Sequence, residues 1–304
     1  MKISLIHASF NSEGRSIAVR DKWYELSDSP VNIEHCLGFE DSDHSLFTEY
    51  GITPGSKTGF SKDMRTRFAT TINQSSPSAV RNWNAAAKLS TGDILVTIAD
   101  DLIPEVGWDT KIVGLADVNP LEVSRIWKVT DFRCARKKDY TKGDIFLPRH
   151  PLITRHLYKK YNYIFDPRFY GVGADDQWLL LSIQNQILFD ARQIKFHHAV
   201  GPIFNSKKEL VCGCKNGVEK NVQTRTESQN RIHTSKLEAE TILSKEWKPV
   251  QMITRNLLCD SRFAKFTTNI SHDKKIVLKN RVYLSLLYVT IKFISLVTKI
   301  RNFI

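Results

Sequence analysis

The apolar residues of this chain fall into short blocks separated by polar stretches. Residues 3–8 and 31–39 predict strands, and residues 94–98 form the clearest strand because they are short, β-branched and uninterrupted, as in a strand covered on both faces. Residues 16–26 predict a helix, and residues 78–89 predict another, with a serine at its start and a glycine just beyond its end. The order strand, helix, strand, connection, helix, strand favours a parallel α/β sheet.

The remaining segments are less regular. Residues 44–75 are polar and glycine-rich, and we expect a long connection there. Residues 152–161 predict a helix, residues 166–173 a loop, and residues 177–186 a helix that two aspartates open. Residues 187–196 predict a strand that ends at a pair of histidines.

Composition narrows the class of protein. Of the 304 residues, 41% are apolar and 25% charged, which is ordinary for a globular protein and excludes a disordered chain, a collagen and a multi-span membrane protein. The five cysteines are few, odd in number and scattered, which indicates a reducing compartment. The start of the chain has only a short apolar run, so we expect no signal peptide and a cytoplasmic protein.

The net charge of +12 is concentrated near the end of the chain. Residues 274–304 contain seven Lys or Arg and no Asp or Glu, and residues 282–291 are uncharged. One interpretation is an amphipathic helix that lies on an anionic membrane at the inner membrane face. The other is a helix that packs on the core with a solvated basic face. A nucleic-acid partner is a less favoured explanation of the same charge.

Carboxylates follow two of the predicted strands. Acidic residues occupy positions 40, 41 and 43 after the second strand, and Asp100 and Asp101 follow the third. Ligands of parallel α/β sheets bind beyond the carboxyl ends of the strands. Two carboxylate groups at one sheet edge suit a divalent cation bound to a diphosphate, because such ions prefer hard oxygen ligands.

Four segments resemble, in order and spacing, the motifs of the family 2 glycosyltransferases. Those motifs are an aliphatic strand followed by Pro-x-Tyr-Asn, then Asp-Asp-x-Ser, then Asn…Ala-Arg-Asn…Gly-Asp, then Asp-x-Asp. The matching segments here are residues 6–11, 39–43, 73–93 and 98–101. This sequence departs from the motifs at three positions: Ala8 replaces the proline, and Glu40 and Ala99 each replace an aspartate.

The resemblance spans residues 3–200 and implies a GT-A fold that transfers a sugar from a nucleotide diphosphate sugar. It implies that Asp41 accepts hydrogen bonds from the base, that Asp100 lies near the ribose or the metal, and that Asp101 is the ligand of Mn²⁺ or Mg²⁺. The other residues of these motifs that it assigns to the nucleotide site are Ala8, Phe10, Asp43, Asn73 and Arg81.

A further segment, residues 171–178, resembles the family's Gly-Glu-Asp motif, whose aspartate is the catalytic base of inverting members. A base must deprotonate the acceptor hydroxyl as it attacks the anomeric carbon. The alignment allows Asp175 or Asp176, and Asp175 is favoured. His197 and His198 are candidate metal ligands, since a late histidine of the family contacts the metal or the diphosphate; strand alternation lets one of them face the site.

These patterns predict three regions. Residues 1–200 form the α/β GT-A catalytic domain, 201–235 a mobile lid or acceptor loop, and 236–304 a helical extension with the basic amphipathic tail. The predicted function is a metal-dependent, inverting glycosyltransferase acting on a cell-surface glycan or lipid-linked acceptor. Two alternatives stay open: a glycosyltransferase that acts on nucleic acid, and a non-catalytic protein that binds nucleotide sugars or glycans, which Ala99 favours.

Overall fold

The structure is a computed structural model. It describes residues 1–12, 14–72, 77–117, 121–133, 148–171, 173–185 and 187–198. The predicted lid at 201–235 and the predicted extension at 236–304 lie outside the described residues. Among the helices that the structure does describe, none is both long and apolar enough to cross a membrane.

The described residues form one mixed, mostly parallel sheet with the strand order β3-β4-β2-β1-β5-β8-β7-β9-β6. Its strands are β1 (Ile3–Ala8), β2 (Ile33–Glu40), β3 (Thr58–Phe60), β4 (Thr66–Thr71), β5 (Ile94–Ala99), β6 (Leu102–Pro104), β7 (Ile126–Arg133), β8 (Leu152–Thr154) and β9 (Leu188–His198). Strands β4, β2, β1 and β5 are parallel neighbours. Strand β8 is antiparallel to both β5 and β7, so β7 and its parallel partner β9 run in the direction of β5.

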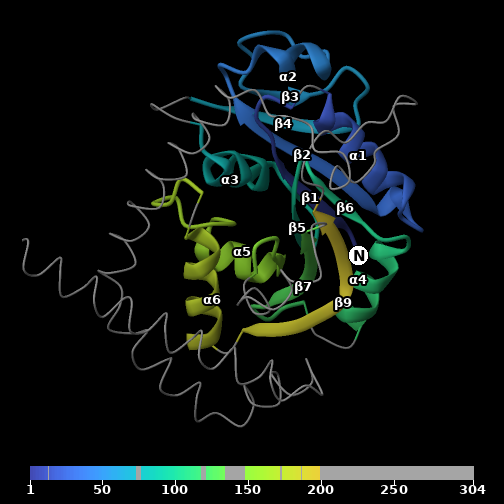
Figure 1. Cartoon of the computed structure of the whole chain (residues 1–304), viewed down its shortest axis with the longest axis vertical. Helices are drawn as coiled ribbons and strands as arrows, with labels where there is room; N and C mark the ends of the chain where they lie inside the picture. The colour runs from blue at the N-terminus through green and yellow to red at the C-terminus, as the bar shows by residue number, and fades with distance from the viewer. Residues whose placement is uncertain are drawn as a thin grey trace, which may run out of the picture.

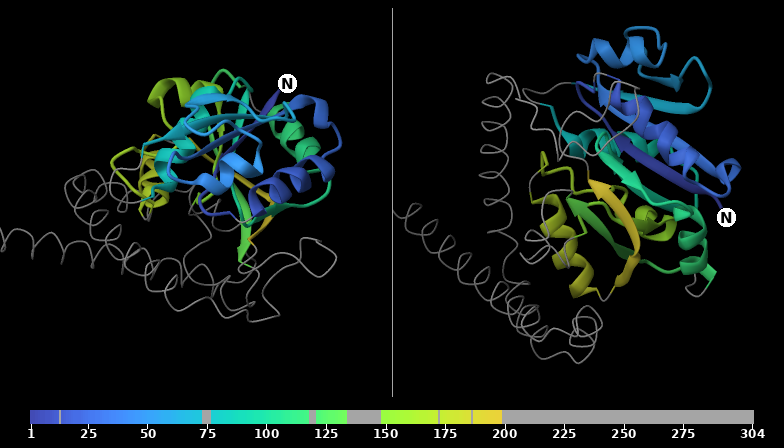
Figure 2. Two further views of the ribbon diagram at one scale, coloured as in Figure 1. Left: turned by 90° about the horizontal axis from the view of Figure 1, so that it is seen from above. Right: turned by 45° about the vertical axis from the view of Figure 1, so that its right-hand side comes forward.

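Helices cover both faces of the sheet, so the molecule has three layers (Figure 1). They are α1 (Arg15–Glu25), α2 (His44–Glu49), α3 (Ala79–Leu89), α4 (Trp108–Asp117), α5 (Arg155–Tyr161) and α6 (Ala174–Gln184), with a 3-10 turn at Pro30–Asn32. Helices α1 and α4 lie on one face and α3, α5 and α6 on the other, as the rotated views of Figure 2 also show.

This layering explains the uninterrupted apolar strands. Side chains alternate between the two faces of a strand, and both faces of β1 are covered. Leu5 therefore packs with Trp23 of α1, and Ile6 packs with Val80 of α3, and none of the four is more than 1% exposed. A third apolar cluster joins α2 to β2 and β4 through Phe39 and its neighbours.

Helix α3 lies unusually close to β2. A methyl group built on Gly38 would lie 1.9 Å from the carbonyl oxygen of Asn82, so only glycine allows this approach. The helix begins where the sequence predicts, because the hydroxyl of Ser78 accepts a hydrogen bond from the backbone N–H of Arg81 at 3.2 Å. The close packing places the first turn of α3 beside the carboxyl end of β2.

The structure confirms the predicted α/β class, because the sheet is mostly parallel and flanked by helices. The expectation of a long connection over residues 44–75 is wrong, since α2, β3 and β4 lie there. The sequence pattern did not predict strand β4, because this strand is rich in threonine and poor in aliphatic residues. Threonine nevertheless favours strands. The predicted helix over 152–161 is wrong in its first turn: Leu152–Thr154 pairs between β5 and β7, and Thr154 then caps α5.

Candidate functional site

The candidate site lies at the carboxyl edge of the sheet, where the strand order reverses. Strands β2 and β4 lie on one side of β1 and β5 lies on the other, and ligands of open α/β sheets bind outside such a switch point. The end of β1 carries Ala8 and Phe10, the end of β2 carries residues 40–43, and Asp100 and Asp101 follow β5. The structure therefore brings three of the predicted motif segments to one edge.

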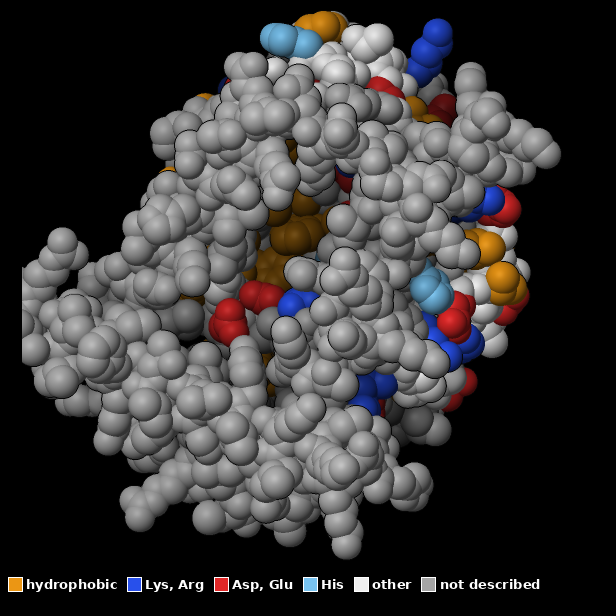
Figure 3. Space-filling view, viewed as in Figure 1, with side chains coloured by type: hydrophobic (Ala, Val, Ile, Leu, Met, Phe, Trp, Pro, Cys, Tyr) orange, Lys and Arg blue, Asp and Glu red, His pale blue; other side chains and the backbone are white. Residues whose placement is uncertain are grey.

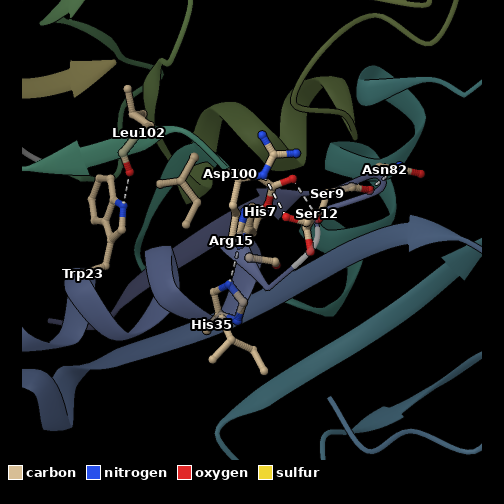
Figure 4. Close-up of polar contacts among 12 residues, drawn as sticks. His7, Ser9, Ser12, Arg15, Trp23, His35, Asn82, Asp100 and Leu102 are labelled. Carbon is tan, nitrogen blue, oxygen red and sulfur yellow. Dashed lines mark hydrogen bonds and ion pairs between the residues drawn. The ribbon is translucent and has the colours of Figure 1, made fainter. Parts of the chain in front are cut away.

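Asp100 is held at this edge from two sides. One carboxylate oxygen lies 2.9 Å from Nε2 of His7, and the other accepts a hydrogen bond of 2.9 Å from the hydroxyl of Ser9 (Figure 4). The Asp100 side chain is 14% exposed and that of His7 is fully buried. These two contacts fix the orientation of the Asp100 carboxylate, which stays partly exposed.

The end of β2 carries a buried carboxylate that the helix α3 supports. Glu40, which stands where the family motif has its first aspartate, is fully buried and accepts hydrogen bonds of 2.7 Å from Arg81 and 2.8 Å from the backbone N–H of Ser78. Both contacts use the same oxygen. The other oxygen, Oε2, is buried without a hydrogen-bond partner among the described residues. The next residue, Asp41, is exposed and is tied to β4 through its backbone N–H.

Asp43 has a structural role. One of its oxygens accepts hydrogen bonds from the hydroxyl of Ser45 and the backbone N–H of Leu46, which caps α2, and the other accepts from the backbone N–H of Asn11. Asp43 thus ties the loop after β1 to the end of β2. Asn73, the remaining candidate of this region, lies outside the described residues.

The first turn of α6 lies at the same edge of the sheet. The backbone N–H of Thr97, near the end of β5, donates to the carbonyl of Pro151, so the segment that precedes β8 lies beside that end. In this segment, Nε of Arg149 is 3.9 Å from Oδ2 of Asp175. Burial raises the pKa of Asp175 although the Arg149 charge opposes the shift. The carboxylate is thus more basic than an ordinary aspartate, and it accepts from the backbone N–H of Asp176.

A buried charged cluster lies next to this segment. The ammonium of Lys128 is 2.9 Å from one oxygen of Asp131, and Nδ1 of His150 is 3.3 Å from the other. Burial alone would raise the pKa of Asp131, but Lys128 and His150 outweigh it and hold that pKa well below its usual range. The ring of His150 lies edge-on to Trp83, whose indole N–H donates to the carbonyl of Ile98 in β5.

The carboxylates after β5 fit a Mn²⁺ or Mg²⁺ ion that takes most of its ligands from a bound diphosphate. Such ions use one or two protein carboxylates, with phosphate and water oxygens completing the shell. Asp101 and Asp100, adjacent after β5, would provide the two carboxylates. No group of three or more His, Cys, Asp or Glu is gathered for a metal within the described ranges. Nε2 of His197, in β9, lies 3.6 Å from Oε1 of Glu105, which follows the paired strand β6. The side chain of His198 lies outside the described residues. The metal role of both histidines stays a prediction.

Hydrophobic side chains gather at the centre of the face seen in Figure 3, with acidic and basic side chains beside them. Sequence reasoning named the carboxylates of the candidate site but missed the side chains that support them, above all His7, Ser9, Arg149 and His150. The signal for His7 was present, because a polar residue in a strand buried on both faces needs a hydrogen-bond partner. The sequence gives no comparable indication for Arg149, because the position of Arg149 depends on the pairing of β8 with β5 and β7.

No protein-family model matches the chain, and no curated protein sequence matches it. Among solved structures, S. aureus TarS 1-349 is similar over 65% of this chain at 13% identity, with a TM-score of 0.49. The same protein in complex with UDP-GlcNAc has a TM-score of 0.48 at 14% identity over 66% of this chain. This chain spans 60% of the length of either TarS chain. The mannosyltransferase PcManGT from Pyrobaculum calidifontis, in complex with GDP-Man and Mn²⁺, has a TM-score of 0.47 at 13% identity; the match covers 97% of this chain and 87% of that one.

Proposed function

We propose that this protein is a glycosyltransferase of the GT-A type that moves a sugar from a nucleotide diphosphate sugar to an acceptor hydroxyl. The observation that carries the proposal is the set of carboxylates at the switch point between β1 and β5. Glu40, Asp100 and Asp101 lie in two of the segments that resemble the family motifs, and the fold brings these segments to one edge.

The nucleotide would lie across the carboxyl ends of β1 and β2. Asp41 is exposed there and can accept hydrogen bonds from the base. Glu40 adds a buried oxygen that accepts no hydrogen bond from the described residues. A buried polar atom without a partner asks for a ligand or another explanation. Asp100, held by His7 and Ser9, would lie near the ribose or the metal.

Asp101, with Asp100 beside it, would hold Mn²⁺ or Mg²⁺. When bound, the ion neutralises charge on the departing diphosphate. Asp175 would act as the base, because its pKa is raised by burial and it lies on the same sheet edge. It takes the proton of the acceptor hydroxyl as that oxygen forms its bond to the anomeric carbon. Attack from the face opposite the diphosphate inverts that carbon.

The acceptor is proposed from the sequence. The basic segment 274–304 favours a glycan or lipid-linked acceptor at the cytoplasmic face of a membrane, with peripheral contact to anionic lipid. It also supports the rival acceptor, a nucleic acid, which binding that weakens steeply with salt but ignores liposomes would favour.

A hydrolysis and transfer screen tests the proposal. The full chain is incubated with UDP-, GDP-, dTDP- and CMP-sugars in Mn²⁺, in Mg²⁺ and in EDTA, and the released nucleotide is measured. We expect one donor to be turned over, with loss of activity in EDTA and in Asp101→Ala. Asp117→Ala, which removes an exposed carboxylate of α4, is the matched control and keeps full activity. Donor binding without turnover under any metal would instead favour the non-catalytic binding protein.

A further inference from the structure

A row of buried polar side chains crosses the sheet beneath α1 and ends at Asp100. Nδ1 of His7 lies 2.9 Å from Nε2 of His35, and Nδ1 of His35 lies 3.0 Å from the hydroxyl of Thr66. That hydroxyl accepts a hydrogen bond of 3.0 Å from Arg20 of α1. With the 2.9 Å contact of His7 to Asp100, the row spans β4, β2, β1 and β5. Figure 4 shows His35, His7 and Asp100 of this row.

The chemistry of the two ends fixes the direction of every hydrogen bond in the row. A guanidinium only donates and an ionised carboxylate only accepts, so Arg20 donates to Thr66 and Nε2 of His7 donates to Asp100. Burial, together with the positive charges of Arg20 and Arg65, holds the pKa of His35 well below its usual range, so His35 is neutral. Thr66 then donates to Nδ1 of His35, and Nε2–H of His35 donates to Nδ1 of His7.

If the hydrogen bonds ran in the opposite direction, the hydroxyl hydrogen of Thr66 would have no acceptor. If Nδ1–H of His35 donated to Thr66, the Thr66 hydroxyl would accept from both His35 and Arg20, and its own proton would have no acceptor among its hydrogen bonds in the structure. His7 would then have to carry protons on both nitrogens. Thr66 and His7 are both fully buried, where an unused donor is costly.

We infer that this row is a positioning relay, in which Arg20, Thr66 and His35 fix the tautomer of His7 with its proton on Nε2 and thereby hold Asp100 ready for the nucleotide. The inference rests on the proposed function and adds residues that touch neither donor nor metal. Arg20 is anchored in turn by Asp63, 2.9 Å away, so the relay runs from the molecular surface to the site.

Apolar side chains in place of this row would stabilise the core without burying polar groups. Four polar side chains no more than 2% exposed, Arg20, Thr66, His35 and His7, give up hydration that apolar side chains would not need. Buried polar rows that are fully satisfied instead specify one arrangement of their members. Here the arrangement that is specified is the orientation of the Asp100 carboxylate.

The test compares Thr66→Val with Thr66→Ser. Valine has the shape of threonine but removes the hydroxyl, whereas serine keeps it. Nitrogen-15 NMR of the histidine rings in the native chain is expected to show the His7 proton on Nε2, and His7→Gln identifies the His7 signals by their loss. In Thr66→Val we expect the His7 signals to shift and the Kd of the donor found in the hydrolysis screen to rise about tenfold, as for other outer-shell partners of a binding site. Thr66→Ser restores both.

His35→Gln and His35→Leu give an independent comparison should Thr66→Val fold poorly. Glutamine can keep the donor to His7 and leucine cannot, so only leucine is expected to weaken donor binding. The inference is overturned if His7 of the native chain carries its proton on Nδ1 or on both nitrogens. It is also overturned if the native chain binds a donor and Thr66→Val binds it equally well. A native chain that binds no donor contradicts the proposed function itself, and with it the role of the relay.

Discussion

Removing one partner of the buried Lys128–Asp131 pair should destabilise the protein far more than removing a surface pair. The two side chains are 4% and 7% exposed and their charged atoms lie 2.9 Å apart. Lys128→Met keeps the length of the side chain but leaves Asp131 with His150 as its one ionisable partner among the described residues. Breaking such a pair costs about 3 kcal/mol or more, which corresponds to a fall in Tm of about 6–12 °C for a domain of this size.

Thermal and urea unfolding of single and double variants measures this effect. Lys128→Met with Asp131→Leu removes both charges and should recover most of the lost stability, because an apolar pair of similar volume replaces a buried ion pair at little cost. Lys111→Met is the matched control. Its ion pair with Glu105 joins side chains 38% and 32% exposed, and its loss should cost less than about 1 kcal/mol. A Lys128→Met variant as stable as the Lys111→Met control would refute the reasoning.

Three further predictions concern the packing, the pH dependence and the base. Gly38→Ala should lower stability by about 2 kcal/mol or more, because its methyl group would meet the backbone of α3 at 1.9 Å; unchanged urea unfolding would contradict the close approach. Burial acts to raise the pKa of Glu34, but hydrogen bonds from its neighbours lower it to about 2. The lowered pKa of Glu34 therefore adds about 3 kcal/mol at most to the free energy of unfolding above about pH 4.5, and this stabilisation is lost as the pH falls toward 2. Glu34→Gln should accordingly make the fall of Tm at acid pH less steep. Asp175→Asn should lower kcat about 100-fold or more without weakening donor binding, whereas Asp176→Asn should not, and the native rate should rise with pH through the raised pKa of Asp175; equal losses in both variants would contradict the assignment.

The parts of the fold that could be predicted are those in which one local signal dominates. Residues 94–98 are apolar on both faces, and Ser78 caps a helix whose apolar positions recur at helical spacing, so β5 and α3 follow from the sequence. Strand β4 and strand β8 could not be predicted, because a threonine-rich segment and a three-residue apolar run become strands only through pairing with β2 and β5. Pairing between distant segments leaves no local pattern.

In the candidate site, too, the features with a local sequence signal could be predicted and those that depend on strand pairing could not. The carboxylates at 40–43 and 100–101 follow strands, so their shared edge could be inferred from the parallel order of those strands. The support of Asp100 by His7 and His35 depends on the register of three strands, which the sequence does not state. The motif position of Asp43 also did not indicate that its carboxylate caps α2 and ties down the loop after β1.

A crystal structure of the protein with Mn²⁺ and the nucleotide of the donor that it hydrolyses tests the central claim most directly. The account predicts the base beside Asp41 and Glu40, the ribose beside Asp100, and the ion between the diphosphate and Asp101. A nucleotide bound elsewhere would contradict it, for example in the depression that Met1, Asn32 and Asp109 line away from these carboxylates. So would an ion that the carboxylates after β5 do not touch.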